Sequence, residues 1–239
     1  EASTRTQGSF EMAGKRLGAD VVNFAVASSS ASKGESLSDT ARTLAAMKPD
    51  IMVVRHPATG APQFLADRTG LSVVNAGDGM HEHPTQALLD SFTLSQRWGE
   101  VGGRRVLSVG AILHSRVARA QRGLWNILGA EIRLCAPPTL LPSDVDQWGC
   151  DVFHDLDEAL KGCDAVMALR QQRERMTGGF VPSAREFFHP FGLTPERLEA
   201  ASPDVLVMHP GPKNRGVEIH TRLADDLERK VPLDQVQSC

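Results

Sequence analysis

Tyrosine is absent from this chain of 239 residues, and aromatic side chains make up only 5% of it. Cysteine is also scarce, and the four cysteines, Cys135, Cys150, Cys163 and Cys239, form no CxxC pair. This spacing argues against a disulfide scaffold and favours reduced thiols in a cytoplasmic protein. We recognise no secretory signal and no apolar run long enough to cross a bilayer, so we expect no membrane partner.

Excess charge of either sign is lacking as well. The formal net charge is -3, from 26 Lys and Arg against 29 Asp and Glu. Such a balance gives no general reason to expect nucleic acid as a partner, so an anion site must be a local cluster of basic groups. With 41% hydrophobic residues, the chain is an ordinary globular sequence with room for two small domains.

Strands and helices alternate along the first part of the chain. Apolar β-branched runs predict strands at 20–26, 51–54 and 71–75, and amphipathic patterns predict helices at 10–17, 36–47 and 62–69. Alternation of this kind predicts an α/β fold with a parallel sheet flanked by helices. In such sheets, ligands bind beyond the carboxyl ends of the strands.

A second series follows a helix at 84–98 and a Gly102-Gly103 linker. It predicts strands at 105–110, 131–135, 164–169 and 205–208, so we expect two domains, 1–97 and 98–239. The second resembles a Rossmann-like sheet, but its first turn, 110–116, lacks the G-x-G-x-x-G fingerprint. A nucleotide-binding module is therefore the less favoured alternative, and we expect no cofactor.

The motif Ser3-Thr4-Arg5-Thr6 stands directly before the first predicted helix. Hydroxyls, unpaired N–H groups at a helix start and a bidentate guanidinium together suit a phosphate group. An ordinary helix cap with a solvent-facing arginine is the alternative for this motif alone.

Polar residues also follow the predicted strands. Lys33 lies in a serine-rich loop, Arg55 ends a strand, and His83 and Gln86 lie about one helical turn apart. A histidine and an amide could polarise a carbonyl oxygen and hold an NH2 group. Zinc binding by His81 and His83 is the weaker alternative, because no third ligand stands at a convincing spacing, and we expect no metal.

Two arginines follow strands of the second series, Arg116 and Arg170, and Gln172 stands close behind. Two such arginines suit a dicarboxylate ligand, whereas Arg173 and Arg175 are more simply solvent-facing. The later run His209-Pro210-Gly211-Pro212 predicts a rigid turn whose carbonyls could accept NH2 groups.

These motifs, together with Lys33-Gly34-Glu35 and His83-Pro84-Thr85-Gln86, resemble in order and spacing the aspartate/ornithine transcarbamoylase family. The resemblance runs from residue 1 to about residue 220. The His209–Pro212 turn, followed by Asn214-Arg215-Gly216-Val217-Glu218-Ile219, is similar to the aspartate branch; the ornithine branch carries a His-Cys-Leu-Pro turn.

The resemblance implies transfer of a carbamoyl group from carbamoyl phosphate to aspartate in pyrimidine synthesis. It implies catalytic roles for Arg5, Thr6, Arg55 and His83. It implies carbamoyl phosphate binding by Ser3, Thr4, Arg5, Thr6, Arg55, His83, Gln86, Gly211 and Pro212, and aspartate binding by Lys33, Arg116, Arg170 and Gln172. The mobile loop of the family, here 29–33, reaches a neighbouring subunit, which implies a homotrimer with shared sites, with regulatory or dihydroorotase chains as further candidate partners.

Some positions depart from the family pattern. Ala111 stands where aspartate is usual, Gln121 where asparagine is common, and Gln7 where arginine is common. Because Glu1 already adjoins a motif and the family pattern fades after Glu218, we expect a chain shortened at both ends. A non-catalytic relative that acts as a structural or regulatory subunit is the alternative.

Overall fold

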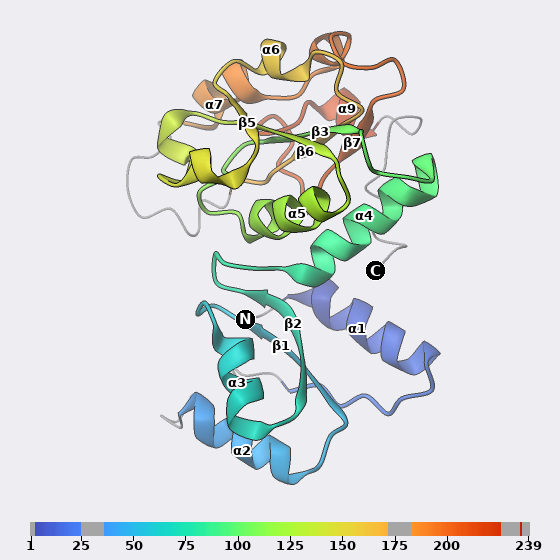
Figure 1. The fold of residues 1–239 in the computed structure, drawn as a ribbon, viewed down its shortest axis with the longest axis vertical. Helices are drawn as coiled ribbons and strands as arrows, with labels where there is room; N and C mark the ends of the chain where they lie inside the picture. The colour runs from blue at the N-terminus through green and yellow to red at the C-terminus, as the bar shows by residue number, and fades with distance from the viewer. Residues whose placement is uncertain (1–2, 25–35, 172–182, 226–234, 236–239) are drawn as a thin grey trace. The chain divides into compact units, whose positions relative to one another are not determined.

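The computed structural model describes residues 3–24, 36–171, 183–225 and 235. The chain divides into two compact units, with the division between Thr85 and Gln86 (Figure 1). Every pair of neighbouring strands in the described part of the chain is parallel, as the alternation of elements predicts. Among the described residues, no helix is both long and apolar enough to span a membrane.

The first unit has a two-stranded parallel sheet with helices. In chain order its elements are α1 (Thr4–Arg16), α2 (Leu37–Ala46), β1 (Ile51–His56), α3 (Ala61–Thr69) and β2 (Ser72–Asp78). Helix α1 begins at Thr4, six residues earlier than the predicted helix body, because the Ser3 side chain caps it. Ser36 caps α2 in the same way.

The strand predicted at 20–26 is wrong over its described residues, 20–24, which form no strand. The β-branched pattern there has no neighbouring strand to pair with among the described residues, since β1 and β2 pair only with each other. Val22 and Phe24 are more than half exposed, so burial does not stabilise an extended ladder either. Residues 25 and 26 lie outside the described part.

The second unit contains a five-stranded sheet in the order β5-β4-β3-β6-β7. Its strands are β3 (Arg105–Val109), β4 (Glu131–Cys135), β5 (Asp151–Phe153), β6 (Ala165–Ala168) and β7 (Leu206–Met208). Its helices are α4 (Pro84–Trp98), whose first two residues belong to the first unit, α5 (Arg116–Ile127), η3 (Pro138–Leu140), η4 (Val145–Trp148), α6 (Leu156–Leu160), α7 (Ala184–Phe191), α8 (Pro195–Leu198) and α9 (Thr221–Asp225).

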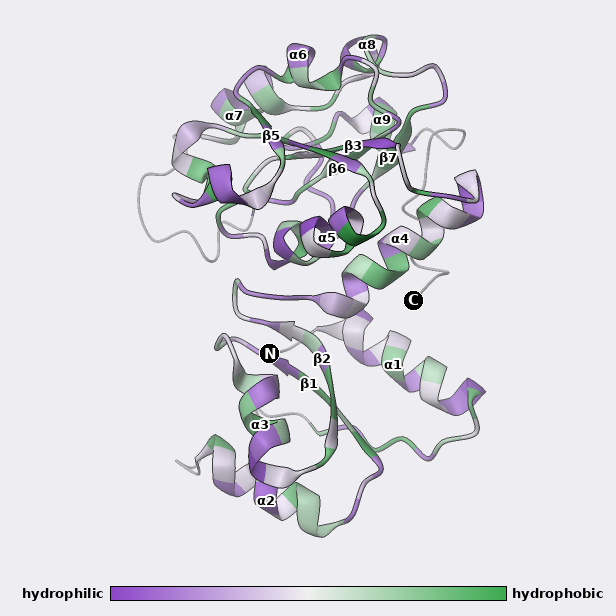
Figure 2. Cartoon of the chain, viewed as in Figure 1, coloured by the Kyte–Doolittle hydropathy of each residue, from purple (hydrophilic) through white to green (hydrophobic). Residues whose placement is uncertain are grey.

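Helices α5 and α6 lie on opposite sides of this sheet (Figure 1). Strand β6 is buried along its whole length, as expected for a central strand covered on both faces. Trp125 and Phe187, from α5 and α7, are the largest fully buried side chains of the core. Hydrophobic and hydrophilic bands alternate along α4, so one face of this helix can pack inward (Figure 2).

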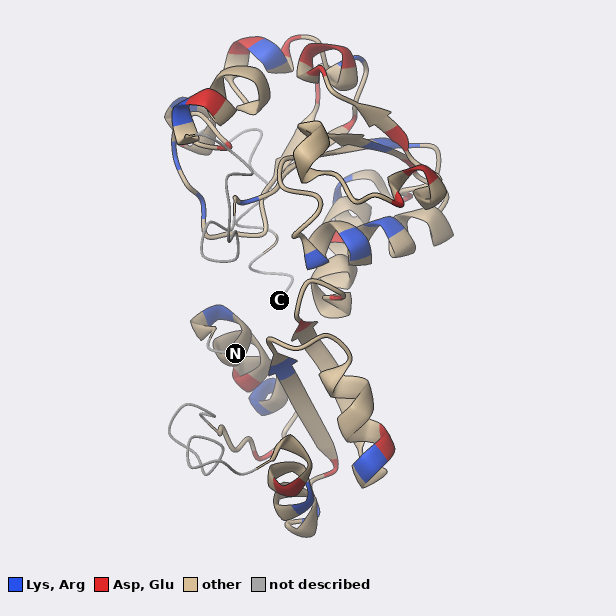
Figure 3. Ribbon diagram, turned by 90° about the vertical axis from the view of Figure 1, so that its left-hand side faces the viewer, with Lys and Arg blue, Asp and Glu red and all other residues tan. Residues whose placement is uncertain are grey.

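Basic and acidic residues both occur in each of the two units (Figure 3). Burial raises the pKa of the Cys135 thiol to about 12 and that of Cys150 to about 11, and it also raises the pKa of Cys163. Thiols with such raised pKa values are protonated at neutral pH and are poor nucleophiles. Cys239 lies outside the described residues.

The turn after β2 depends on Gly79. Its φ is +49°, and a Cβ there would lie 2.6 Å from Thr59 Oγ1, 2.9 Å from the Thr59 nitrogen and 3.0 Å from the Pro57 oxygen. Gly70 has a similar φ of +69°, but a Cβ there would meet nothing within 4 Å. Comparing substitutions at Gly70 and Gly79 therefore distinguishes the cost of backbone strain, which both share, from the cost of steric overlap, which arises at Gly79.

We expect Gly70→Ala to lower the free energy of unfolding by about 1 kcal/mol, the cost of a left-handed alanine. Gly79→Ala should cost about 3 kcal/mol, because steric overlap with backbone atoms adds to the same strain. Urea unfolding of both variants measures the difference. Equal losses for the two variants would show that the turn relaxes freely around a methyl group.

Candidate active site

The start of α1 presents the Ser3–Thr6 motif. Ser3 Oγ accepts a hydrogen bond from the Thr6 N–H at 3.4 Å and lies 3.0 Å from Thr6 Oγ1. Thr4 and Arg5 are exposed in the first turn, which contains no acidic residue. Because the helix dipole is positive at this end and the first turn of α1 contains no acidic residue, the turn is suited to an anion.

Arg55 connects this turn to the rest of the first unit. From the end of β1, its Nη1 donates to Thr6 Oγ1 at 3.2 Å and to the Ala76 carbonyl at 3.3 Å. The same nitrogen lies 3.4 Å from His83 Nε2. The structure therefore brings together Thr6, Arg55 and His83, which are far apart in the sequence.

The loop between β2 and α4, which carries His83, is organised by Asp78. This buried carboxylate accepts from the Gly60 N–H at 2.7 Å, the Glu82 N–H at 3.0 Å and Asn75 Nδ2 at 3.1 Å, and it lies 3.3 Å from His81 Nδ1. Burial alone would raise the pKa of Asp78, but these hydrogen bonds outweigh it and lower the pKa. No group of three potential metal ligands occurs in the described part of the chain.

Gln86 begins the second unit, and its amide is tied to a buried acid. Gln86 Nε2 donates to Asp90 Oδ1 at 3.0 Å, one turn later on α4. Asp90 also accepts from Gln121 Nε2 and from Gln235 Nε2, both at 2.6 Å. Burial raises the pKa of Asp90 to about 7, although the three amide donors oppose this shift.

Arg116 and Arg170 follow neighbouring strands. Val109, the last residue of β3, is paired with Ala168, the last residue of β6. Arg116 opens α5 after the Ser115 cap and is only 3% exposed, whereas Arg170 is half-buried. Because both strands end at one edge of the sheet, both arginines leave that edge. Two further predicted aspartate ligands, Lys33 and Gln172, and the loop 29–33 lie outside the described residues.

The His209–Pro212 turn follows β7, the neighbour of β6. The Gly211 N–H donates to His209 Nδ1 at 2.8 Å, and His209 Nε2 lies 3.0 Å from Glu218 Oε1. Glu218 Oε1 also accepts from the Asn214 N–H at 2.5 Å. The Gly211–Pro212 peptide bond is cis. The turn is thus fixed by side chains on both sides of it.

Sequence reasoning missed the acids and amides that hold these groups. Asp78 stands between two glycines, which is a turn signal, and Asp90 follows Gln86 by four residues on one helix. Those signals were available. No local pattern could connect Gln235 to Asp90, which lies 145 residues away in the sequence.

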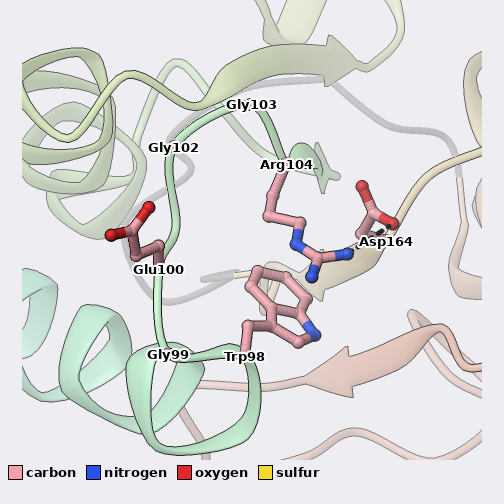
Figure 4. A pocket seen from close by; sticks show the side chains of 7 residues that line it. All are labelled: Trp98, Gly99, Glu100, Gly102, Gly103, Arg104 and Asp164. Carbon is pink, nitrogen blue, oxygen red and sulfur yellow. Dashed lines mark ion pairs between the residues drawn. The ribbon is translucent and has the colours of Figure 1, made fainter.

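A separate pocket of about 670 Å³ lies in the second unit, next to the start of β3. Figure 4 shows the Arg104 side chain between the Trp98 indole and Asp164, with Glu100 directed away from them. The Arg104 guanidinium carbon lies 5.2 Å from the Trp98 ring centre, and its Nη1 lies 3.7 Å from Asp164 Oδ1. Because this is the amino end of the strands, the pocket is at the opposite edge from Arg116 and Arg170.

Two family models cover most of the chain. Residues 1–96 match the carbamoyl-P binding domain of aspartate/ornithine carbamoyltransferase, and residues 103–238 match the Asp/Orn binding domain. The chain is 90% identical over 238 residues to the aspartate carbamoyltransferase catalytic subunit of Maricaulis maris, covering 100% of this chain and 74% of that protein. The corresponding subunit of Parvibaculum lavamentivorans is 57% identical, with 99% and 72% covered.

Solved structures of carbamoyltransferases are similar to this chain along its whole length. Aspartate transcarbamoylase from Trypanosoma cruzi, in complex with carbamoyl aspartate and phosphate, matches with a TM-score of 0.85 and 32% identity. The match covers 100% of this chain and 77% of that one. Ornithine carbamoyltransferase from Pyrococcus furiosus matches with a TM-score of 0.89 and 26% identity, covering 100% and 78%.

The lowered pKa of Asp78 makes a prediction about acid stability. A carboxyl group whose pKa is lower in the folded protein stabilises the fold above its unfolded pKa of about 3.9, and this contribution is lost as the pH falls through the lower folded value. We expect Asp78→Asn to lower the free energy of unfolding by about 2–3 kcal/mol at neutral pH. The exposed acid Asp157 supplies the control, Asp157→Asn.

Urea unfolding between neutral pH and about pH 3 tests this expectation. The difference in the free energy of unfolding between the unmodified protein and Asp78→Asn should become smaller at acid pH, because both proteins then carry an uncharged group at this position. A difference in the free energy of unfolding that became larger towards acid pH would contradict the lowered pKa of Asp78.

Proposed function

The chain belongs to the aspartate/ornithine carbamoyltransferase family, and we infer from this premise that it is a carbamoyltransferase with L-aspartate as the acceptor. It transfers the carbamoyl group of carbamoyl phosphate to the α-amine of aspartate, and the products are N-carbamoyl-L-aspartate and phosphate. The choice of aspartate rests on the 90% and 57% identical catalytic subunits, which are named for this reaction. We assign the reaction to de novo pyrimidine synthesis.

We propose that residues 1–97 bind carbamoyl phosphate. The observation that carries this assignment is the convergence of Thr6, Arg55 and His83, with the helix start of α1 beside them. Hydroxyl, guanidinium and imidazole groups are the donors that a phosphate and a polarised carbonyl require. Three residues of the second unit, Gln86, Gly211 and Pro212, complete the proposed set, whose members in the first unit are Ser3, Thr4, Arg5, Thr6, Arg55 and His83.

We propose that residues 98–239 bind aspartate. Arg116 and Arg170 leave the same sheet edge, and two guanidinium groups match the two carboxylates of aspartate. A cationic ornithine side chain would be repelled by such a pair. Lys33 and Gln172 complete the proposed set.

The proposed reaction needs no covalent enzyme intermediate, metal or cofactor. The α-amine nitrogen attacks the carbamoyl carbon, and negative charge develops on the carbonyl oxygen. Arg5, Thr6 and His83 stabilise this oxyanion, while Arg55 binds the phosphate side. The carbon–oxygen bond to phosphate then breaks, and the departing phosphate takes the proton from the amine. The basic side chains offset the repulsion between the two anions, and holding both reactants in one site lowers the entropic barrier.

We further propose that the chain acts in the cytoplasm as a homotrimer with shared sites. In this proposal the loop 29–33 supplies Lys33 to a neighbouring copy. Regulatory or dihydroorotase chains are candidate partners. The mass of the purified chain in solution, measured with and without substrates, tests the trimer.

Arg55→Ala should lower the kcat for carbamoylaspartate formation by about 100-fold to 1,000-fold, the usual cost of a lost charge-stabilising donor. Stability should fall less, because Arg55 is only half-buried. Arg42→Ala, at an exposed position on α2, is the control and should retain full activity. Undiminished turnover in Arg55→Ala would contradict the proposed phosphate site, and no turnover in the unmodified chain would favour the non-catalytic alternative.

Arg170→Ala should raise the KM for aspartate by about 10-fold or more, because one carboxylate loses a charged hydrogen bond. The thermal shift produced by carbamoyl phosphate alone should stay the same. Arg185→Ala, an exposed position on α7, is the matched control. A loss of carbamoyl phosphate binding in Arg170→Ala, with the KM for aspartate unchanged, would reverse the assignment.

A further inference from the structure

The carboxylate of Asp90 is fully buried and is surrounded by amides. Its exposed fraction is 0%, and it accepts hydrogen bonds from Gln86 at the start of α4, Gln121 on α5 and Gln235. No cation accompanies it among these hydrogen-bond partners in the described chain. Burying a carboxylate without a counter-charge is costly, so its presence calls for a specific reason.

An ionised carboxylate can only accept hydrogen bonds, so it dictates which end of each amide faces it. Gln86 must direct its NH2 towards Asp90, which it does at 3.0 Å, and its Oε1 must then point elsewhere. A glutamine without such a partner could flip, because its oxygen and nitrogen ends have nearly the same shape. Asp90 therefore leaves Gln86 with a carbonyl acceptor to offer.

Gln121 shows how strongly this carboxylate selects donors. Its Nε2 donates to Asp90 Oδ2 at 2.6 Å, while its own Oε1 is buried with no hydrogen-bond partner in the described structure. A buried carbonyl without a partner costs about 1–3 kcal/mol. The amide keeps this orientation because the alternative would set an oxygen against the carboxylate.

Gln235 extends the same ordering to the His209 turn. Its Nε2 donates to Asp90 Oδ1 at 2.6 Å, and its Oε1 accepts the His209 N–H at 3.0 Å. Asp90 therefore fixes the amide of Gln235 as well, and that amide holds the first residue of the turn that contains Gly211 and Pro212. One oxygen atom, Asp90 Oδ1, contacts both glutamines.

We propose that Asp90 is a positioning residue for the carbamoyl group: it orients Gln86 so that Oε1 accepts from the carbamoyl NH2, and it holds the His209–Pro212 turn through Gln235. This inference rests on the proposed function, since it takes Gln86 and the turn as carbamoyl-binding groups. The acid itself touches no substrate. A carbamoyl NH2 donates two hydrogen bonds, so two correctly oriented acceptors distinguish it from a group without hydrogen to donate.

A double-variant cycle tests the proposal through kcat at about one unit above the pKa of Asp90, near pH 8. Asp90→Asn removes the acceptor-only character and lets Gln86 flip, and we expect a 10-fold to 100-fold loss of kcat. Gln86→Ala should cause a similar loss. If Asp90 acts largely through Gln86, the combined variant should lose much less than the product of the two separate losses. If the loss of kcat in the combined variant equals the product of the two separate losses, the proposal is wrong.

Gln121→Met is the matched control for stability. This substitution removes the amide that donates to the other carboxylate oxygen, Asp90 Oδ2, and leaves the hydrogen bonds of Gln86 and Gln235 to Oδ1 in place. We expect a lower melting temperature with kcat within about 3-fold of the unmodified protein. A purely structural role for Asp90 would instead make the kcat loss follow the loss of melting temperature in both variants.

A second measurement applies if Asp90→Asn does not fold. In the unmodified, nitrogen-labelled protein, the side-chain NH2 signals of Gln86 are identified by their disappearance in Gln86→Ala. Donation to Asp90 predicts that one of these protons exchanges with water more slowly than in a free glutamine. Exchange at the free rate would overturn the proposal even if the protein is active. Absence of carbamoylaspartate formation by the unmodified protein would refute the proposed function instead.

Discussion

The parallel arrangement of β3, β6 and β7 is the constraint on which the second unit depends. Because neighbouring strands run in one direction, everything that follows their last residues leaves the sheet at one edge. Arg116, Arg170 and the His209 turn come from three separate parts of the sequence and reach that edge for this reason alone. The opposite edge holds the pocket beside Arg104, which has a different set of side chains.

Two buried aspartates, Asp78 and Asp90, orient side chains and turns near the ends of the strands. Their environments shift their pKa values in opposite directions. Asp78 accepts from the Gly60 and Glu82 N–H groups and from the Asn75 side chain, and these donors lower its pKa despite burial. The donors to Asp90 among the described residues are neutral amides, and burial outweighs them and raises its pKa. In both cases a carboxyl group, which in its ionised form can only accept hydrogen bonds, fixes the geometry of a loop or an amide near a proposed ligand-binding residue.

Much of the architecture was predictable from local patterns. Strand β4 matches the predicted 131–135, and α4 matches 84–98, because each has a clear apolar period and clear end signals. The strand prediction at 20–24 was wrong because a strand needs a neighbouring strand to pair with, and the local sequence pattern does not show whether one is present. The motifs located Thr6, Arg55 and His83, yet no periodicity reveals that one guanidinium nitrogen contacts all three of Thr6, Ala76 and His83.

The contact between Asp90 and Gln235 has a consequence for biosynthesis. During translation, α4 leaves the ribosome long before Gln235 is made, so Asp90 must wait for 145 further residues before its third amide arrives. A nascent chain that stops just short of Gln235 would already contain every residue proposed to touch a substrate. It would still lack the amide that connects the acid to the His209 turn. Quality control of such prematurely ended chains would therefore have to detect the incompletely fixed His209 turn, since the proposed substrate-binding groups themselves would be present.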